Sequence, residues 1–255
     1  MMGYSIGLAG KGGTGKTTLA GLCVKYLVEQ GKTPVLAVDA DANANFNEVL
    51  GLEVIETLGD AREEMKKGGL PGMTKDIFME MKLEQAVVEA EGFDLIVMGR
   101  PEGSGCYCAA NTLLTQYLDR LIHNYASVVI DNEAGMEHIS RMTTNNIDLL
   151  LVVSDTSRRG ILSAARIFEL TDSLPVNVGR KALVINQARE SQEEAVKKIV
   201  EEYDLPLEGI LPEDEEIQQF DLQGRPTIEL GPENPVLKAA YHVFEKVLKN
   251  GSSAY

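Results

Sequence analysis

The sequence predicts a single α/β domain with a mainly parallel sheet and helices on both of its faces. Short apolar runs of strand length alternate with longer segments in which apolar residues recur at helical spacing. The alternation continues along the chain without an internal repeat, a low-complexity linker or a shift of composition that would mark a domain boundary. Strands that alternate with helices form parallel sheets that are covered on both faces. We therefore expect one domain over residues 1–250 and a short tail over 251–255.

The expected strands are mostly aliphatic, as is typical of parallel strands buried on both faces. They fall at residues 4–9, 34–38, 94–98, 127–130, 148–153, 181–185 and 207–211. The first helix follows residues 10–18 and ends at Gly31, where the helical spacing stops. Further helical patterns cover 43–92 with glycine and proline breaks, about 109–124, 159–173, 191–203 and 235–249.

Composition limits the classes of function. The 255 residues suffice for a large core, and no apolar run approaches membrane-spanning length. The formal net charge of −15 disfavours binding to DNA or to anionic membranes. Three cysteines without secretory features point to a reducing compartment, where paired cysteines bind metal more often than they form disulfides. We expect a cytoplasmic protein that binds neither nucleic acid nor a membrane.

A phosphate-binding loop lies between the first expected strand and the first expected helix. Residues 10–18, GKGGTGKTT, fit the pattern GxxxxGK[ST] at every position. The glycines let backbone N–H groups turn toward a polyanion, and the helix N-terminus adds partial positive charge. Lys16 is expected to neutralise the outer phosphates of ATP, and the Thr17 hydroxyl to bind Mg²⁺. The expected nucleotide ligands are the residues of the loop: Gly10, Lys11, Gly12, Gly13, Thr14, Gly15, Lys16, Thr17 and Thr18.

The loop contains a second lysine, Lys11, that the pattern does not require. Near the start of the loop, a long cation cannot easily curl back onto its own nucleotide. It could instead reach a nucleotide held by a facing subunit. The loop therefore predicts both a nucleoside triphosphate and a homodimer.

Acidic side chains follow two expected strands at the edge where parallel sheets bind ligands. Asp39 and Asp41 follow the second strand, and the run 127–130 leads into Asp131 in the manner of a Walker B strand. Such a carboxylate can hold magnesium directly or through a water. We expect Asp39 and Asp131 to join Thr17 at a magnesium site. Asp41 is expected to position the attacking water, the alternative being a helix cap.

Two further segments at strand ends carry possible nucleotide contacts. Asp131 to Gly135 has the D-x-x-x-G spacing of a nucleotide switch, in which a glycine N–H meets the γ-phosphate, and His138 beyond it is expected to be structural. Asn186 ends the strand 181–185, where its amide could bond an adenine edge, and Pro212 would lie beside it. An asparagine at a strand end is also a common turn residue.

Cys106 and Cys108 lie in a glycine-rich turn rather than on an apolar face. Residues i and i+2 of an extended chain point the same way, so both sulfurs could meet one ion. A two-fold axis beside this turn would assemble four thiolates from two subunits. Such a site suits zinc or an iron–sulfur cluster, and nickel also fits. Cys23, on the apolar face of the first helix, is expected in the core.

These motifs together resemble the MinD/ParA-like branch of P-loop ATPases, the deviant Walker A family. The matching residues are the loop with both lysines, Asp39 with Asp41, residues 131–135 and Asn186. The resemblance covers nearly the whole domain. It implies a P-loop NTPase fold, ATP sandwiched in a face-to-face dimer, a Lys11 that reaches the partner's nucleotide, and an Asp41 that activates water.

Within this branch, Cys106, Cys108 and the stretch 131–138 resemble the nickel-insertion ATPases that mature carbon monoxide dehydrogenase and acetyl-CoA synthase, the CooC/AcsF group. The resemblance implies that the paired cysteines bind Ni²⁺ or Zn²⁺ at the dimer interface. It also implies that ATP hydrolysis rearranges the dimer and releases metal to one of these two client enzymes. Two alternatives stay open, an iron–sulfur carrier or reductase-type ATPase and a positioning ATPase that acts on a membrane or DNA.

Overall fold

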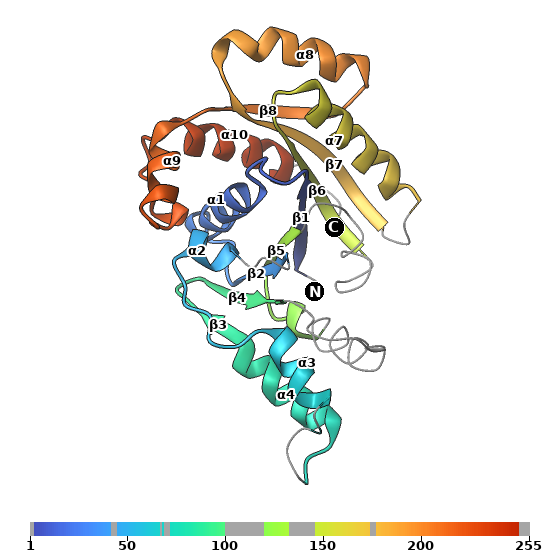
Figure 1. Cartoon of the computed structure of the whole chain (residues 1–255), viewed down its shortest axis with the longest axis vertical. Coiled ribbons are helices and arrows are strands. Elements are labelled where there is room, and N and C mark those ends of the chain that lie inside the picture. The colour runs from blue at the N-terminus through green and yellow to red at the C-terminus, as the bar shows by residue number, and fades with distance from the viewer. Residues whose placement is uncertain are drawn as a thin grey trace.

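The computed structural model describes residues 3–41, 45–66, 68, 72–99, 120–132, 146–173 and 177–249 (Figure 1). Within these residues one sheet has the strand order β3-β4-β2-β5-β1-β6-β7-β8. All neighbouring strands run parallel except the edge pair of β3 and β4, which is antiparallel. The predicted α/β class with a mainly parallel sheet is confirmed.

Six of the described strands begin and end within two residues of their predicted bounds, whereas the strand predicted at 181–185 covers 177–188 and the strand at 87–89 was not predicted. Eight strands are described in all. They are β1 (Tyr4–Gly10), β2 (Val35–Ala40), β3 (Val87–Glu89), β4 (Phe93–Val97), β5 (Ser127–Asn132), β6 (Asn146–Ser154), β7 (Asn177–Ala188) and β8 (Leu207–Pro212). The α-helices are α1 (Lys16–Glu29), α2 (Phe46–Leu50), α3 (Leu58–Lys66), α4 (Lys75–Ala86), α7 (Arg158–Thr171), α8 (Glu193–Glu202), α9 (Glu215–Leu222) and α10 (Pro235–Lys249). Two 3₁₀ turns, η1 (Glu190–Gln192) and η2 (Thr227–Glu229), complete the described elements.

The aliphatic strands are buried because both faces of the sheet are covered. Successive side chains of a strand point to opposite faces. In β2, Val35 and Ala37 pack in the cluster that contains α1 and α10, while Leu36 and Val38 pack against α3 and α4. A third cluster joins β6 and β7 to α7 and α8. Figure 1 shows α1 and α10 on one side of the sheet and α7 on the other.

The last helix, α10, packs on its own domain, as its apolar face predicts. Val236, Leu237, Phe244, Val247 and Leu248 are all buried in the cluster that also contains α1. Within the described residues, none of the helices has both the length and the apolar character needed to cross a membrane. Cys23 is fully buried in this cluster, as expected, and burial raises the pKa of its thiol to about 12.

The structure corrects the sequence-based expectations at two places. Residues 87–89, expected to be helical, form the edge strand β3, because their backbone pairs with β4 in an antiparallel ladder. The helix α9 was not expected, since its eight residues show too few apolar positions for a clear helical period. Of the predicted helix at about 109–124, residues 120–122 are helical, and 109–119 and the tail 251–255 lie outside the described residues.

Candidate functional site

The loop at residues 10–18 has the backbone that its glycines predict. Gly10, Gly13 and Gly15 have φ values of 152°, 80° and 85°, which side-chain-bearing residues rarely adopt. A Cβ added at Gly10 would lie 2.1 Å from the carbonyl oxygen of Val153 in β6. Gly15 also precedes α1 as its N-cap, without a side chain over the first N–H groups of the helix. Those N–H groups are therefore open toward an anion.

The two lysines of the loop are placed differently. Lys16 is buried, and its Nζ donates to the backbone carbonyl of Lys11 at 3.4 Å. The same carbonyl accepts a hydrogen bond from Thr14 Oγ1 at 2.9 Å. The side chain of Lys11 is exposed. Lys11 thus supports the loop with its backbone, while its charged side chain faces solvent.

Asp39 lies near the end of β2, and its side chain is fully buried. Its Oδ1 accepts from the backbone N–H of Asp41, and its Oδ2 from that of Phe46, each at 3.0 Å. These bonds connect the end of β2 to the start of α2. Burial nevertheless raises the pKa of Asp39 to about 6, because the charged form is desolvated.

Asp131 lies beside Asp39, because the two residues are register partners on β5 and β2. Burial raises the pKa of Asp131 to about 7, and the charges of Asp39 and Asp41 add to this rise. The Thr17 hydroxyl and Lys16 act in the opposite direction. Within the described residues, neither carboxylate oxygen of Asp131 has a hydrogen-bond partner of normal geometry, so Thr17 is close without completing a bond.

A buried carboxylate next to a threonine hydroxyl, with no hydrogen bond of normal geometry from the described residues, fits a magnesium ion that also binds a nucleotide. Buried charges are normally paired or bound to a metal. Among the described residues, no three His, Cys, Asp or Glu side chains form a group that could hold a metal ion by themselves. Thr17 and Asp131 would therefore need phosphate oxygens or waters as further ligands, as magnesium sites of this kind use. Asp39 lies next to them, already engaged by two N–H groups.

Asn186 joins β7 to the phosphate-binding loop. It is buried, and its Nδ2 donates to the carbonyl oxygen of Thr14 at 2.9 Å. The pairing of β7 with β8 is irregular between Ile185 and Ala188, and Gln187 adopts a positive φ of 59°. Bulges of this kind redirect side chains near functional sites. One of the two N–H donors of the Asn186 amide is thus used inside the protein, and the contact of this amide with a base stays a prediction.

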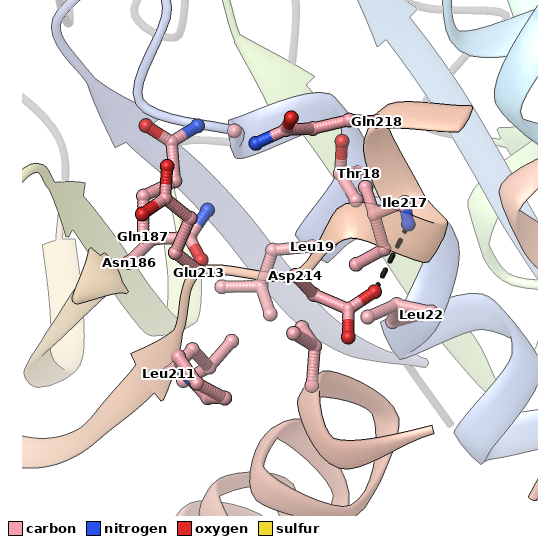
Figure 2. Close-up of a pocket in the computed structure, with 13 residues that line it drawn as sticks. Thr18, Leu19, Leu22, Asn186, Gln187, Leu211, Glu213, Asp214, Ile217 and Gln218 are labelled. Atoms are coloured by element: carbon pink, nitrogen blue, oxygen red, sulfur yellow. Dashed lines mark hydrogen bonds between the residues drawn. The ribbon is translucent and has the colours of Figure 1, made fainter. Parts of the chain in front are cut away.

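A pocket opens beside Gly15 and encloses about 460 Å³ of empty space, its open mouth included (Figure 2). One side comes from α1 with Thr18, Leu19 and Leu22, and another from the ends of β7 and β8 with Asn186 and Pro212. The remaining side comes from α9 and α10. Its residues are Asp214, Ile217, Gln218 and Val236. Asn186 and Pro212, predicted to be neighbours at a base site, therefore line one cavity next to the phosphate loop.

The sequence reasoning missed the α9 side of this pocket. Asp214 is the N-cap of α9, and its Oδ1 accepts from the backbone N–H of Ile217 at 3.0 Å. The signal was present, because an aspartate followed by two glutamates is a typical helix start. Cys106, Cys108, Gly135 and His138 lie outside the described residues.

Comparisons with known proteins agree with this geometry. Residues 6–228 match the family model described as the CobQ/CobB/MinD/ParA nucleotide binding domain. An uncharacterized ATP-binding protein of Methanocaldococcus jannaschii is 43% identical over 95% of this chain and 98% of its own length. The carbon monoxide dehydrogenase accessory protein CooC of Rhodospirillum rubrum is 30% identical over 89% of this chain and 90% of its own.

Solved structures show the same fold. The cell division ATPase MinD of Pyrococcus furiosus has a TM-score of 0.72 at 23% identity, covering 98% of this chain and all of its own. The septum site-determining protein MinD of Pyrococcus horikoshii, solved with Mg-ADP, has a TM-score of 0.72 at 23% identity and covers both chains fully. At this identity the likeness concerns the fold.

Proposed function

The chain belongs to the CobQ/CobB/MinD/ParA family of nucleotide-binding domains, and we propose that it is an ATP-dependent nickel metallochaperone for carbon monoxide dehydrogenase or acetyl-CoA synthase. It is a MinD/ParA-like P-loop ATPase related to CooC. The observation that carries the finer proposal is the 30% identity to CooC over most of both chains, together with the Cys106 and Cys108 pair.

ATP is proposed to bind with its phosphates on the loop 10–18 and its nucleoside in the pocket lined by Asn186 and Pro212. The buried Lys16 is proposed to neutralise the phosphates, because its Nζ already contacts the loop backbone. Thr17 and Asp131 would hold Mg²⁺, with Asp39 beside them. When bound, this ion neutralises phosphate charge as the γ-phosphate departs.

Hydrolysis is proposed to take place in a dimer. ATPases of the MinD/ParA type commonly dimerise. The exposed Lys11 side chain is free to meet the nucleotide of the facing subunit, as the family resemblance implies. Asp41 follows the buried strand β2 and would position the attacking water. Nickel or zinc, the cargo, would bind between the subunits at Cys106 and Cys108.

Metal analysis of separated monomer and dimer, with and without ATP, tests this proposal. We expect about one nickel per dimer in the wild type and loss of the metal in Cys106→Ala and Cys108→Ala, with ATP binding by the monomer intact. Cys23→Ala is the matched control, since this thiol is fully buried and should not affect the metal. Retention of nickel by both of the first two variants would rule out this site.

The same preparations separate the two alternative functions. A brown protein with an absorption band near 400 nm (roughly, for thiolates bound to a cluster) would favour an iron–sulfur carrier. ATP-dependent sedimentation with liposomes or DNA would favour a positioning ATPase. The likeness to MinD structures at 22–23% identity does not favour a positioning ATPase, because a likeness at this identity reflects the shared fold.

A further inference from the structure

The pocket beside Gly15 has one side built from the N-termini of two helices, α9 and α10. Asp214 and Ile217 come from the start of α9, and Val236 from the start of α10. These helices are separated in the chain by η2 and by the turn that ends at Asn234. The shape of this side therefore depends on how the two N-termini are held together.

Asn234 holds them together through every polar atom of its side chain. Its Oδ1 accepts from the backbone N–H of Leu237 at 3.0 Å and so caps α10. Its Nδ2 donates to Asp214 Oδ1 at 3.1 Å and to Glu216 Oε2 at 3.0 Å. Asn234 is only 4% exposed, so water competes little for these bonds. A buried amide thus links the cap of α10 to the cap of α9.

This arrangement leaves one oxygen of Asp214 for the pocket. Oδ1 is occupied by the Ile217 N–H and by Asn234, whereas Oδ2 makes no hydrogen bond within the described part of the chain. Asp214 lines the pocket, where Figure 2 shows its carboxylate near Leu22 and Ile217. When one oxygen of a carboxylate is held, the other oxygen points in a fixed direction. An ionised carboxylate has no proton to donate, so a ligand at this oxygen must supply the N–H or O–H.

We propose that Asn234 is a positioning residue of the nucleoside pocket: it fixes Asp214 so that the second carboxylate oxygen accepts a hydrogen bond from the nucleoside. This inference rests on the proposed binding of ATP with its nucleoside in this pocket. The donor is a ribose hydroxyl or the amino group of the base, and Asn234 acts on either through Asp214. Without the amide, the carboxylates of Asp214 and Glu216 lose their shared donor, and the Asp214 carboxylate can rotate away from the pocket.

Two substitutions remove the amide while keeping the cap of α10. Asn234→Ser retains an oxygen that can accept from Leu237 N–H. Asn234→Asp also retains it, but places a third carboxylate against Asp214 and Glu216. We measure the dissociation constants of Mg-ATP and of Mg-tripolyphosphate, which lacks the nucleoside, by calorimetry on the full chain. In both variants the dissociation constant of Mg-ATP should rise by about tenfold, or about 1.4 kcal/mol. The dissociation constant of Mg-tripolyphosphate should stay within about twofold of the wild-type value.

Thr74→Ala is the matched control for loss of a helix cap. Thr74 caps α4 by accepting from the Ile77 N–H, and it is not a residue of the pocket. This variant should lower the melting temperature without changing the affinity for either ligand. ITP, 2′-deoxy-ATP and 3′-deoxy-ATP then identify the donor, because the analogue that lacks the donating group should bind wild type and Asn234→Ser with equal affinity.

If the Asn234 variants bound ATP and tripolyphosphate with equally reduced affinity, the inference would be overturned, since the effect would then lie at the phosphate loop. Unchanged binding of ATP would overturn it as well. Failure of the proposed function has a different signature, because wild type would then bind ATP normally but carry no nickel, or would not bind ATP at all.

Discussion

Gly15 and Asn186 show how closely single residues of the phosphate loop fit the strand beside it. Gly15 has a φ of 85°, and a Cβ at this position would lie 2.3 Å from Nδ2 of Asn186. The same Nδ2 donates to the Thr14 carbonyl. Two independent reasons therefore require a glycine here: the positive φ of the backbone, and the lack of space for a Cβ beside the Asn186 amide. The motif predicts the glycine, but only the fold reveals which side chain would meet the added carbon.

Gly15→Ala should destabilise the protein even without nucleotide. The left-handed backbone costs an alanine about 1–2 kcal/mol, and the contact with Asn186 must shift as well. We expect the free energy of unfolding to fall by about 2–3 kcal/mol and ATP binding to be lost. Gly12→Ala is the control, because no atom lies within 4 Å of its added Cβ. Urea denaturation of both variants is the measurement, and equal stability would contradict the steric argument.

Asp39 and Asp131 predict a pH dependence of stability in the nucleotide-free protein. Their pKa values rise to about 6 and about 7, against about 3.9 for an aspartate in an unfolded chain. The folded state therefore holds these protons more tightly than the unfolded state. The resulting stabilisation is complete below about pH 4 and is lost as the pH rises through 6 and 7. The free energy of unfolding, measured in EDTA, should fall accordingly between pH 5 and 8.

Asp131→Asn separates this effect from other titrations. Asparagine cannot be charged at this buried position, so the fall in stability above pH 6 should become shallower. Above pH 7 the variant should be more stable than the wild type in EDTA, and it should bind Mg-ATP less tightly. A variant with an unchanged slope would show that other groups cause the pH dependence.

At the scale of elements, a polar contact holds the starts of β1 and β6 in register. Asp148 Oδ2 accepts from the backbone N–H and the hydroxyl of Ser5, at 2.7 and 2.8 Å. The hydroxyl oxygen in turn accepts from the Asp148 N–H at 3.0 Å. This contact lies at the end of β1 opposite the phosphate loop. It therefore contributes to the sheet without contributing to the site.

Ser5→Ala should lower the free energy of unfolding by about 1–3 kcal/mol, because the Asp148 carboxylate loses the hydroxyl donor and keeps only the Ser5 N–H, while the Asp148 N–H loses its acceptor. The KM for ATP and kcat should be unchanged. Ser163→Ala in α7 is the control, since its hydroxyl only bonds the carbonyl of Arg159 on the exposed surface. Guanidinium denaturation and a steady-state ATPase assay give both readouts. A changed KM in Ser5→Ala would indicate that β1 transmits strain to the loop.

At the scale of the whole molecule, Lys11 connects the site of one subunit to a second subunit. Its carbonyl is engaged by Thr14 and Lys16, whereas its side chain is exposed. Its charge is positive, whereas the net charge of the chain is −15. Truncation of this side chain leaves the backbone bonds of the loop in place. Effects of the truncation should therefore appear in assembly and hydrolysis.

Lys11→Ala should lose ATP-driven dimerisation and reduce kcat by about 100-fold or more, the scale of lost transition-state stabilisation by one positioned cation. ATP affinity should stay within about threefold, because Lys16 and the loop backbone remain. Light scattering after size exclusion, with and without ATP, measures the assembly. Lys32→Ala, an exposed lysine in the connection between α1 and β2, is a control for charge alone. A dimeric Lys11→Ala variant would contradict the role across the interface.

The sequence by itself determined the fold class, the order of the main strands and helices, and the phosphate loop. These follow from local pattern, because buried parallel strands must be aliphatic and a phosphate loop must contain glycines. It also identified Asp39 and Asp131 as strand-end carboxylates. Only the tertiary structure decided that they are register partners and that Asp131 is buried without a hydrogen-bond partner of normal geometry among the described residues. It alone revealed the α9 side of the pocket and the link through Asn234, since these contacts join residues that are distant in the chain.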